Sequence, residues 1–463
     1  ATLQFHDVAR KIEKLHIMFE NSGVKRGDKI ALCGRNSSHW AVAFLATLTY
    51  GAIAVPVQNE FTPEQIHNIV NHSESKLLFV GDVVCTQVNP DMMPALEGIV
   101  YLPDFSITIS RSEQLTFARE HLNEIFGKRY PKYFRKEHVH YYKEESPEEL
   151  AMINYTSGTT GFSKGVMLPY RALWGNIDYV LKCLTPNVKP GSNLVSILPM
   201  AHMYGLAVEF LFGFINGCHL YFLNRMPSPS LIAEAFAEVK PRLIVAVPLV
   251  VEKIIRRKVL AEVQTNRMKL LLNMPVINKK IKQHIRDRIM EAFGGNAYEI
   301  IVGGAPLNQG IEEFLNSVGV PITIGYGTTE TAPLITFANY DNYKIASCGP
   351  VVDHMEAKVV SPDPANVPGE LIAKGMNVML GYYKNEEATN AVLDKDGWFH
   401  TGDLATMAPS GHIYIKGRIK NMLLGANGQN VYPEEIEDKL NNMPLVGESI
   451  IIQRDTKLIA LVH

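Results

Sequence analysis

The chain has 463 residues, 46% of them hydrophobic, so it can bury more than one core and we expect at least two domains. Its 45 Lys and Arg residues nearly balance 47 Asp and Glu residues, and no segment resembles a nucleic-acid-reading module, which argues against a nucleic-acid partner. The five cysteines show no metal-ligand spacing, which predicts free thiols in a reducing compartment and neither disulfides nor a structural zinc.

Helix-like and strand-like segments alternate through the first two thirds of the chain. This alternation predicts an α/β fold with parallel sheets covered by helices on both faces. The predicted helices are residues 5–22, 62–72, 231–239 and 308–317, and the predicted strands are residues 29–33, 53–57, 76–80, 243–247, 299–302 and 320–324.

A glycine- and hydroxyl-rich loop at residues 155–166 separates the apolar run 151–155 from a stretch compatible with a helix. Its glycines let backbone N–H groups turn inward, its Ser and Thr side chains add O–H donors, and Lys164 adds a mobile positive charge. A polyanion such as the β,γ end of ATP would satisfy these donors together. Since the spacing is not that of a Walker loop, we predict a nucleotide loop of another kind.

The residues just before this loop carry a helix-start signal. Ser146, Pro147 and Glu149 match an N-cap, an N1 proline and a capping-box glutamate. They predict a short helix that leads into the strand at 151–155. A glycine loop that leaves such a strand is where α/β proteins bind phosphates, which disfavours an ordinary surface loop.

Two further segments bear on a membrane contact. The apolar stretch 204–223 contains Glu209, Asn216 and His219, so it is predicted to be buried core rather than a membrane span. Residues 253–288 carry eleven basic and two acidic side chains, typical of either a solvated helical face or a surface for anionic lipid. We therefore expect a cytoplasmic protein, with peripheral contact at the inner membrane surface as an open alternative.

The amino-acid pattern of the chain changes near residue 347. Residues 347–416 combine short strands with frequent Gly and Pro, which predicts a small antiparallel or barrel-like β unit. Beyond Arg418 a further unit begins, with an amphipathic helix opening at Pro433. We predict a large domain at 1–418 and the start of a small C-terminal domain at 419–463, truncated or unresolved. We expect both chain ends to be trimmed or unresolved, so targeting signals are not read from this sequence.

Three motifs follow the loop in order, at residues 325–331 (Gly-Tyr-Gly-Thr-Thr-Glu-Thr), 398–403 (Trp-Phe-His-Thr-Gly-Asp) and 417–421 (Gly-Arg-Ile-Lys-Asn), the last followed by 428–437. Together with the loop they resemble the acyl-adenylate-forming superfamily of acyl-CoA synthetases, firefly-type luciferases and peptide-synthetase adenylation domains. The resemblance extends from near Phe5 to the end of the chain. It implies a large domain of two helix-covered, mainly parallel sheets with a β-barrel-like unit, followed by a small mobile α+β domain.

The resemblance also implies a reaction and its substrates. A carboxylate attacks the α-phosphate of ATP with Mg²⁺ present, giving acyl-AMP and pyrophosphate, and the thiol of coenzyme A then takes the acyl group. The implied catalytic residues are Lys164, Thr329, Glu330 and His202, with Glu330 and Thr156 as metal ligands. The implied contacts to ATP and coenzyme A are Thr156, Ser157, Gly158, Thr159, Thr160, Gly161, Gly304, Ala305, Pro306, Tyr326, Gly327, Asp403, Arg418 and Gly428, and the hinge of the small domain is Lys420.

Within this implied site the roles differ by chemistry. Tyr326 offers a flat face to adenine and the loop 303–306 the opposite wall, while Asp403 accepts the ribose hydroxyls and Arg418 donates to the same sugar. Thr329 would donate to the α-phosphate, and Gly428 would line the pantetheine tunnel. A purely structural role is the alternative for each of these residues. Tyr326 would then be a core residue, Asp403 a turn residue, Arg418 part of a surface ion pair, Gly428 a turn glycine and His202 a hydrogen-bonded core histidine.

Departures from the family pattern and the choice of acid complete the expectation. Ser163 stands where the family usually has proline, and the family's adenylation lysine would lie beyond His463, so the 463-residue chain is expected to adenylate poorly. Residues 201–206 contain no aspartate for an amino-acid ammonium, and the apolar segment 206–214 suits a hydrocarbon tail. We expect a medium or long fatty acid, with an aryl or branched acid, a carrier-protein-loading ligase and a non-catalytic nucleotide sensor as alternatives.

Overall fold

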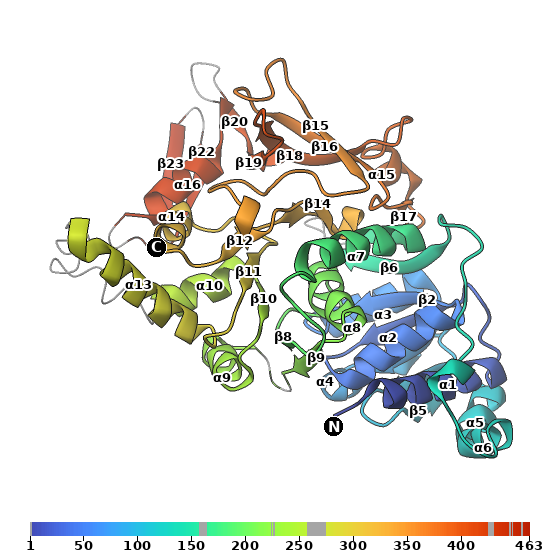
Figure 1. Cartoon of the computed structure of the whole chain (residues 1–463). Coiled ribbons are helices and arrows are strands. Elements are labelled where there is room, and N and C mark those ends of the chain that lie inside the picture. Colours follow the sequence, from blue (N-terminus) through green and yellow to red (C-terminus); the bar gives the residue numbers. More distant parts are fainter. Residues whose placement is uncertain are drawn as a thin grey trace.

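The structure, a computed structural model, describes residues 2–156, 164–223, 225, 227–256, 275–424, 430–443, 446, 448–454 and 457–463. Figure 1 shows three regions, with the N-terminal sheet and its helices in blue, a central sheet in green and yellow, and an orange to red β-rich region beside the C-terminal segment. All five cysteines are free thiols.

An eight-stranded sheet organises the first region, in the order β17-β7-β6-β2-β1-β3-β4-β5. The strands from β6 to β4 run parallel, and antiparallel strands close both ends. The strands are β1 (Lys29–Cys33), β2 (Ile53–Val57), β3 (Ser75–Val80), β4 (Gly98–Tyr101), β5 (Ser106–Ser110), β6 (Leu150–Thr156), β7 (Lys164–Pro169) and β17 (Gly381–Tyr382).

Helices cover both faces of this sheet, as the continuous apolar strands predicted. In β1, Ile30 and Leu32 pack toward α1 and α2, whereas Ala31 and Cys33 pack toward α3. A capping box fixes the start of α3, where Thr62 and Gln65 bond each other's backbone N–H. The helices of this region are α1 (Phe5–Asn21), α2 (Ser38–Tyr50), α3 (Pro63–Ser73), α4 (Asp82–Cys85), α5 (Glu113–Glu120) and α6 (Leu122–Arg129).

The second sheet has five parallel strands in the order β12-β11-β10-β8-β9. The strands are β8 (Asn193–Ser196), β9 (His219–Phe222), β10 (Leu243–Ala246), β11 (Glu299–Val302) and β12 (Ile322–Ile324). The helices here are α7 (Tyr170–Leu184), α8 (Phe212–Ile215), α9 (Pro229–Val239), α10 (Pro248–Ile255), α13 (Pro275–Ala292) and α14 (Gln309–Ser317). The two mainly parallel sheets confirm the predicted fold class, and the strands predicted at 29–33, 53–57 and 299–302 have the predicted bounds.

The apolar stretch 204–223 is part of this core. It forms a π-helix at Gly205–Leu211, then α8 and β9. Every residue of the π-helix is buried, including Glu209, whose carboxylate accepts hydrogen bonds from the backbone N–H groups of Ile197 and Leu198. In the part of the chain that the structure describes, no helix is both long and apolar enough to span a bilayer.

The predicted β-rich unit is an antiparallel sheet in the order β15-β16-β18-β19, drawn in orange to red in Figure 1. Its strands are β15 (Met355–Val360), β16 (Gly369–Gly375), β18 (Phe399–Met407) and β19 (Ile413–Arg418), and α15 (Glu386–Asn390) lies in the β16–β18 connection. A hairpin of β13 (Tyr326–Gly327) and β14 (Leu334–Thr336) precedes it. The C-terminal segment contains β20 (Leu423–Leu424), β21 (Asn430–Val431), α16 (Pro433–Asn441), β22 (Ser449–Arg454) and β23 (Lys457–Val462).

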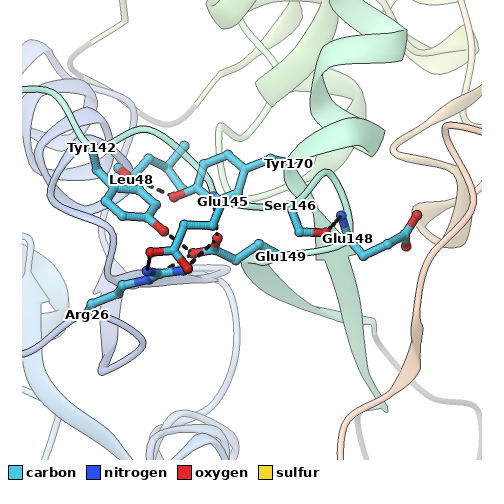
Figure 2. Close-up of polar contacts among 8 residues, drawn as sticks. All are labelled: Arg26, Leu48, Tyr142, Glu145, Ser146, Glu148, Glu149 and Tyr170. Carbon is cyan, nitrogen blue, oxygen red and sulfur yellow. Dashed lines mark hydrogen bonds and ion pairs between the residues drawn. The ribbon is translucent and has the colours of Figure 1, made fainter.

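The short helix predicted at Ser146 is wrong, since residues 145–149 form bends and turns. Figure 2 shows that the Glu149 carboxylate, the expected capping-box acceptor, turns instead toward Tyr142 and Arg26. It accepts the Tyr142 O–H at 2.6 Å and pairs with an Arg26 guanidinium nitrogen at 2.8 Å. A charged partner and a phenol outcompete one helical N–H, so the capping box never forms.

The helix expected directly after the glycine loop is also wrong, because Lys164 begins strand β7. This strand pairs antiparallel with β6, with Thr156 opposite Lys164. The spacing of buried side chains is that of a strand, since Val166 and Leu168, two positions apart, are fully buried while Lys164 is exposed. The predicted nucleotide loop therefore lies between two paired strands in the sequence, and the next helix, α7, starts only at Tyr170.

A buried histidine between α1 and α2 makes acid stability testable. His16 Nε2 lies 3.1 Å from the Ala46 carbonyl oxygen, and burial lowers the His16 pKa to about 4. An unfolded histidine takes up a proton below about pH 6.5, so the unfolded state gains stability as the pH falls toward 4. Between pH 7 and 5.5, we expect the free energy of unfolding of His16→Gln to fall by about 1 kcal/mol less than that of wild type. Urea denaturation at both pH values measures the difference. Equal losses in both proteins would contradict this assignment.

Candidate functional site

The candidate nucleobase pocket forms where two neighbouring parallel strands end. Val302 of β11 pairs with Ile324 of β12, so the segments 303–306 and 325–327 leave the same edge of the second sheet side by side. Ligands of open α/β sheets bind at such carboxyl ends. This arrangement places Gly304, Ala305 and Pro306, all exposed, next to Tyr326 and Gly327.

Glycine is required at two of these positions. Gly304 has φ +85°, in the left-handed region that favours glycine. A Cβ on Gly327 would stand 1.7 Å from the carbonyl oxygen of Pro333, across the β13–β14 hairpin. The backbone at Gly327 therefore approaches the backbone at Pro333 more closely than any side chain would allow.

Three side chains form a connected acceptor and donor set beside this pocket. The Tyr326 O–H donates to Asp403 Oδ2 at 2.6 Å, and Arg418 Nε lies 3.2 Å from Asp403 Oδ1. Asp403 and Arg418 face each other because they are register partners in β18 and β19. Asp403 is buried, with its pKa raised by burial against the opposing effects of Tyr326 and Arg418. Among the described residues each carboxylate oxygen has one of these partners, which leaves a lone pair on each for a ribose hydroxyl.

A second set links the glycine loop to the candidate metal ligand. Glu330 lies in the short 3₁₀ turn Thr329–Thr331, and its Oε1 accepts the Tyr382 O–H at 2.7 Å. Lys164 Nζ lies 4.8 Å from the centroid of the same Tyr382 ring. The loop lysine and the candidate metal ligand are therefore neighbours across one tyrosine.

The two sets belong to one site. Glu330 is close enough to raise the pKa of Asp403 electrostatically, and Thr329 lies between Tyr326 and Glu330 along the chain. Thr156 is half-buried at the end of β6, opposite Lys164. The predicted contacts at Ser157, Gly158, Thr159, Thr160, Gly161 and Gly428 lie outside the described residues.

The donor set around Glu330 suits Mg²⁺. In the described part of the chain no three His, Cys, Asp or Glu residues cluster as a complete metal cage. Mg²⁺ in nucleotide sites usually needs only one or two carboxylates plus substrate phosphates and water. A single glutamate that shares a tyrosine contact with Lys164 therefore fits this ion, with Thr156 as a neutral oxygen donor.

His202 lies in a loop that two asparagines hold in place. Asn36 Oδ1 accepts the Met200 N–H at 2.8 Å, and Asn154 Nδ2 donates to the Ala201 carbonyl at 2.9 Å. The Tyr204 N–H points at His202 Nδ1 at 3.3 Å, which assigns the ring proton to Nε2. The His202 side chain is exposed, and desolvation by the surrounding protein lowers its pKa, which favours the neutral imidazole.

The candidate hinge lies between the β-rich sheet and α16. Lys420 is exposed in the 3₁₀ turn Ile419–Asn421, directly after Arg418. Asn421 Nδ2 donates to Glu434 Oε1 at 2.8 Å, and a Cβ on Gly417 would stand 2.6 Å from Glu434 Oε2. On its other side α16 contacts α14, where Asp438 Oδ1 accepts the Gln309 N–H at 3.2 Å.

Comparison with known proteins fits this geometry. A family model described as AMP-binding enzyme matches residues 1–383. The chain belongs to the AMP-binding enzyme family. It is similar to a long-chain-fatty-acid–CoA ligase of Escherichia coli O6:H1 (31% identity, 95% of this chain, 77% of the relative) and to the human long-chain-fatty-acid–CoA ligase ACSBG2 (24% identity, 99% and 71%).

Solved structures agree on the fold. ATP-bound MatB from Rhodopseudomonas palustris has a TM-score of 0.77 at 25% identity, covering 98% of this chain and 82% of that protein. The o-succinylbenzoate coenzyme A synthetase MenE from Bacillus subtilis, in complex with AMP, has a TM-score of 0.74 at 20% identity, covering 100% and 84%. Both solved structures share the mixed α/β architecture of this chain.

Sequence reasoning missed Tyr382, Asn36 and Asn154. No local pattern marks a residue whose importance comes from β17 docking on β7, more than 200 positions away in sequence. The asparagines follow or lie within strands β1 and β6, where a polar residue in an apolar run could have signalled a functional edge.

Proposed function

We propose that this AMP-binding enzyme is an ATP-dependent acid–thiol ligase that activates a fatty acid as acyl-AMP and transfers the acyl group to coenzyme A. One observation supports the proposal: Tyr382 contacts both Lys164 and Glu330, and Glu330 is close enough to raise the pKa of Asp403, the partner of Arg418. The names of the curated relatives support the acid class.

In the first step the side chains align and neutralise charge. Asp403 and Arg418 hold the ribose, Tyr326 and the loop 303–306 enclose the base, and Lys164 with the loop hydroxyls binds the β,γ-phosphates. Thr329 donates to the α-phosphate. Glu330 would hold Mg²⁺, which would supply positive charge to the phosphates during attack by the fatty acid carboxylate.

In the second step the acceptor thiol reaches the acyl carbonyl. We assign to neutral His202, with its proton on Nε2, a hydrogen bond donated near the reacting carboxyl group, which its motif position and its tautomer support. We place the domain boundary after Arg418, with residues 419–463 turning about Lys420 between the two steps. Gly428 is assigned to the pantetheine tunnel by its motif.

The apolar segment 206–214 bears on the acyl tail. Most of it packs in the core, but Phe210 and Phe214 also line a cavity of about 1240 Å³ together with Val42 and Leu45 of α2. Asn36, which holds the His202 loop, lines the same cavity. A cavity this large accepts a lipid tail, which supports a fatty acid over a small aryl acid.

Filling this cavity should shorten the preferred acid. We expect Leu45→Trp to lower kcat/KM for hexadecanoate by about tenfold, because the indole takes space that the distal methylenes need. Octanoate, which ends nearer His202, should be activated as in wild type and is the internal control. Equal losses for both acids would show that the tail does not extend into this cavity.

The proposed function itself is tested by acid-dependent pyrophosphate release from the full-length protein, across acids of graded chain length. We expect release that rises with chain length and acyl-CoA formation when free coenzyme A is added. Transfer only to a phosphopantetheinyl carrier protein would favour the carrier-loading ligase, and ATP binding without pyrophosphate release would favour the nucleotide sensor. Binding of the full-length protein to anionic vesicles would test the predicted membrane contact at the basic region 253–288.

A further inference from the structure

The segment around Tyr382 is fixed to the phosphate-loop hairpin by its backbone. The two-residue strand β17 pairs antiparallel with β7, with Tyr382 opposite Val166, and the Tyr383 N–H donates to the Gly165 carbonyl at 2.7 Å. On the other side the Tyr382 N–H donates to Thr389 Oγ1 at 2.8 Å. The Tyr382 ring is therefore held from two directions before any ligand binds.

The same segment holds Glu330 twice. The Met379 N–H donates to the Glu330 carbonyl at 2.8 Å, and the Tyr382 O–H donates to Glu330 Oε1 at 2.7 Å. The Tyr382 phenol is thus a hydrogen-bond donor to this carboxylate. With Oε1 engaged, Glu330 presents Oε2 to other partners.

The ring also separates two opposite charges. Lys164 Nζ lies over the face of the Tyr382 ring, and no ion pair joins Lys164 to Glu330 among the described residues. A direct pair would cancel the charges that ATP and its metal need. The aromatic face attracts the ammonium without neutralising it.

We propose that Tyr382 is a positioning residue, which orients Glu330 toward Mg²⁺ through its hydroxyl and keeps Lys164 available for phosphate through its ring. The inference rests on the proposed function, since it needs a nucleotide and a metal ion at this site. Removing the Tyr382 hydroxyl should lower the affinity for Mg²⁺. It should not change the part of ATP binding that is independent of the metal. Mutation of a residue that hydrogen-bonds a metal-ligating carboxylate typically lowers metal affinity by about tenfold or more.

The test compares Tyr382→Phe with the matched control Tyr383→Phe in the full-length protein. Both variants lose one phenolic hydroxyl, but the Tyr383 O–H donates to the exposed Glu74, away from the site. ATP binding is measured by calorimetry in EDTA and at graded Mg²⁺, together with the Mg²⁺ concentration that half-saturates pyrophosphate release and the unfolding temperature.

We expect Tyr382→Phe to need about tenfold more Mg²⁺, with unchanged ATP binding in EDTA, and Tyr383→Phe to match wild type. Tyr382→Leu, which also lacks the ring, should additionally weaken ATP binding in EDTA. An unchanged Mg²⁺ requirement in Tyr382→Phe, or a loss that Mg²⁺ concentration does not affect, overturns the inference. Failure of the wild-type protein to bind ATP in a Mg²⁺-dependent way overturns the proposed function instead.

Discussion

Glu330→Gln is expected to lower the rate of acid-dependent pyrophosphate release by about 100- to 1,000-fold. The amide keeps the shape of the side chain and still accepts the Tyr382 hydrogen bond, so the substitution removes mainly the negative charge. Mg²⁺ binds carboxylate far better than amide oxygen when it must also hold phosphates. Initial rates at saturating ATP, titrated with Mg²⁺, measure the effect.

Excess Mg²⁺ should restore part of the Glu330→Gln rate, because the lost charge weakens metal binding first. Glu356→Gln is the matched control, since Glu356 is exposed on β15 and undergoes the same change in charge. A Glu330→Gln enzyme with a wild-type rate and Mg²⁺ requirement would remove Glu330 from the metal site.

Asp403→Asn should weaken ATP binding by about 100-fold, or about 3 kcal/mol. An asparagine has one acceptor oxygen, so it cannot serve Tyr326, Arg418 and two ribose hydroxyls together. The ribose is held in the same way in the ground state and the transition state, so KM for ATP should rise much more than kcat falls.

The sugar contact can be separated from general damage with deoxy nucleotides. Wild type should discriminate against 2′-deoxy-ATP and 3′-deoxy-ATP, and Asp403→Asn should lose that discrimination. Asp396→Asn, at an exposed turn of the same β-rich region, is the control and should retain it. Discrimination that survives in Asp403→Asn would assign the sugar to other groups.

Much of the fold is predictable because strands that are buried on both faces consist of continuous apolar residues. The apolar runs at 29–33, 53–57 and 299–302 begin and end where the strands begin and end. Thr62 and Gln65 mark a helix start by a local capping box. The signal at Ser146 has the same form but fails, because tertiary partners of Glu149 compete for its carboxylate. Local patterns succeed where no distant charge intervenes.

The site is predictable where motif residues follow strand ends. Tyr326, Asp403 and Arg418 meet as their motifs imply, since parallel strand ends and antiparallel register bring them together. Tyr382 has no such pattern, because its partners Lys164 and Glu330 come from two other parts of the chain. The π-helix at Gly205–Leu211 is equally hidden, since its wider turn leaves no distinct periodicity in an all-apolar segment.

The docking of β17 on β7 also has a consequence for biosynthesis. While the ribosome is still making residues before 380, the outer edge of β7 has no partner strand, and the carbonyls of Gly165 and Met167 stay open to other chains. Unpaired edges of this kind template intermolecular pairing. We therefore expect the first sheet to keep an open edge at β7 until Gly381 and Tyr382 have been synthesised and can pair with it.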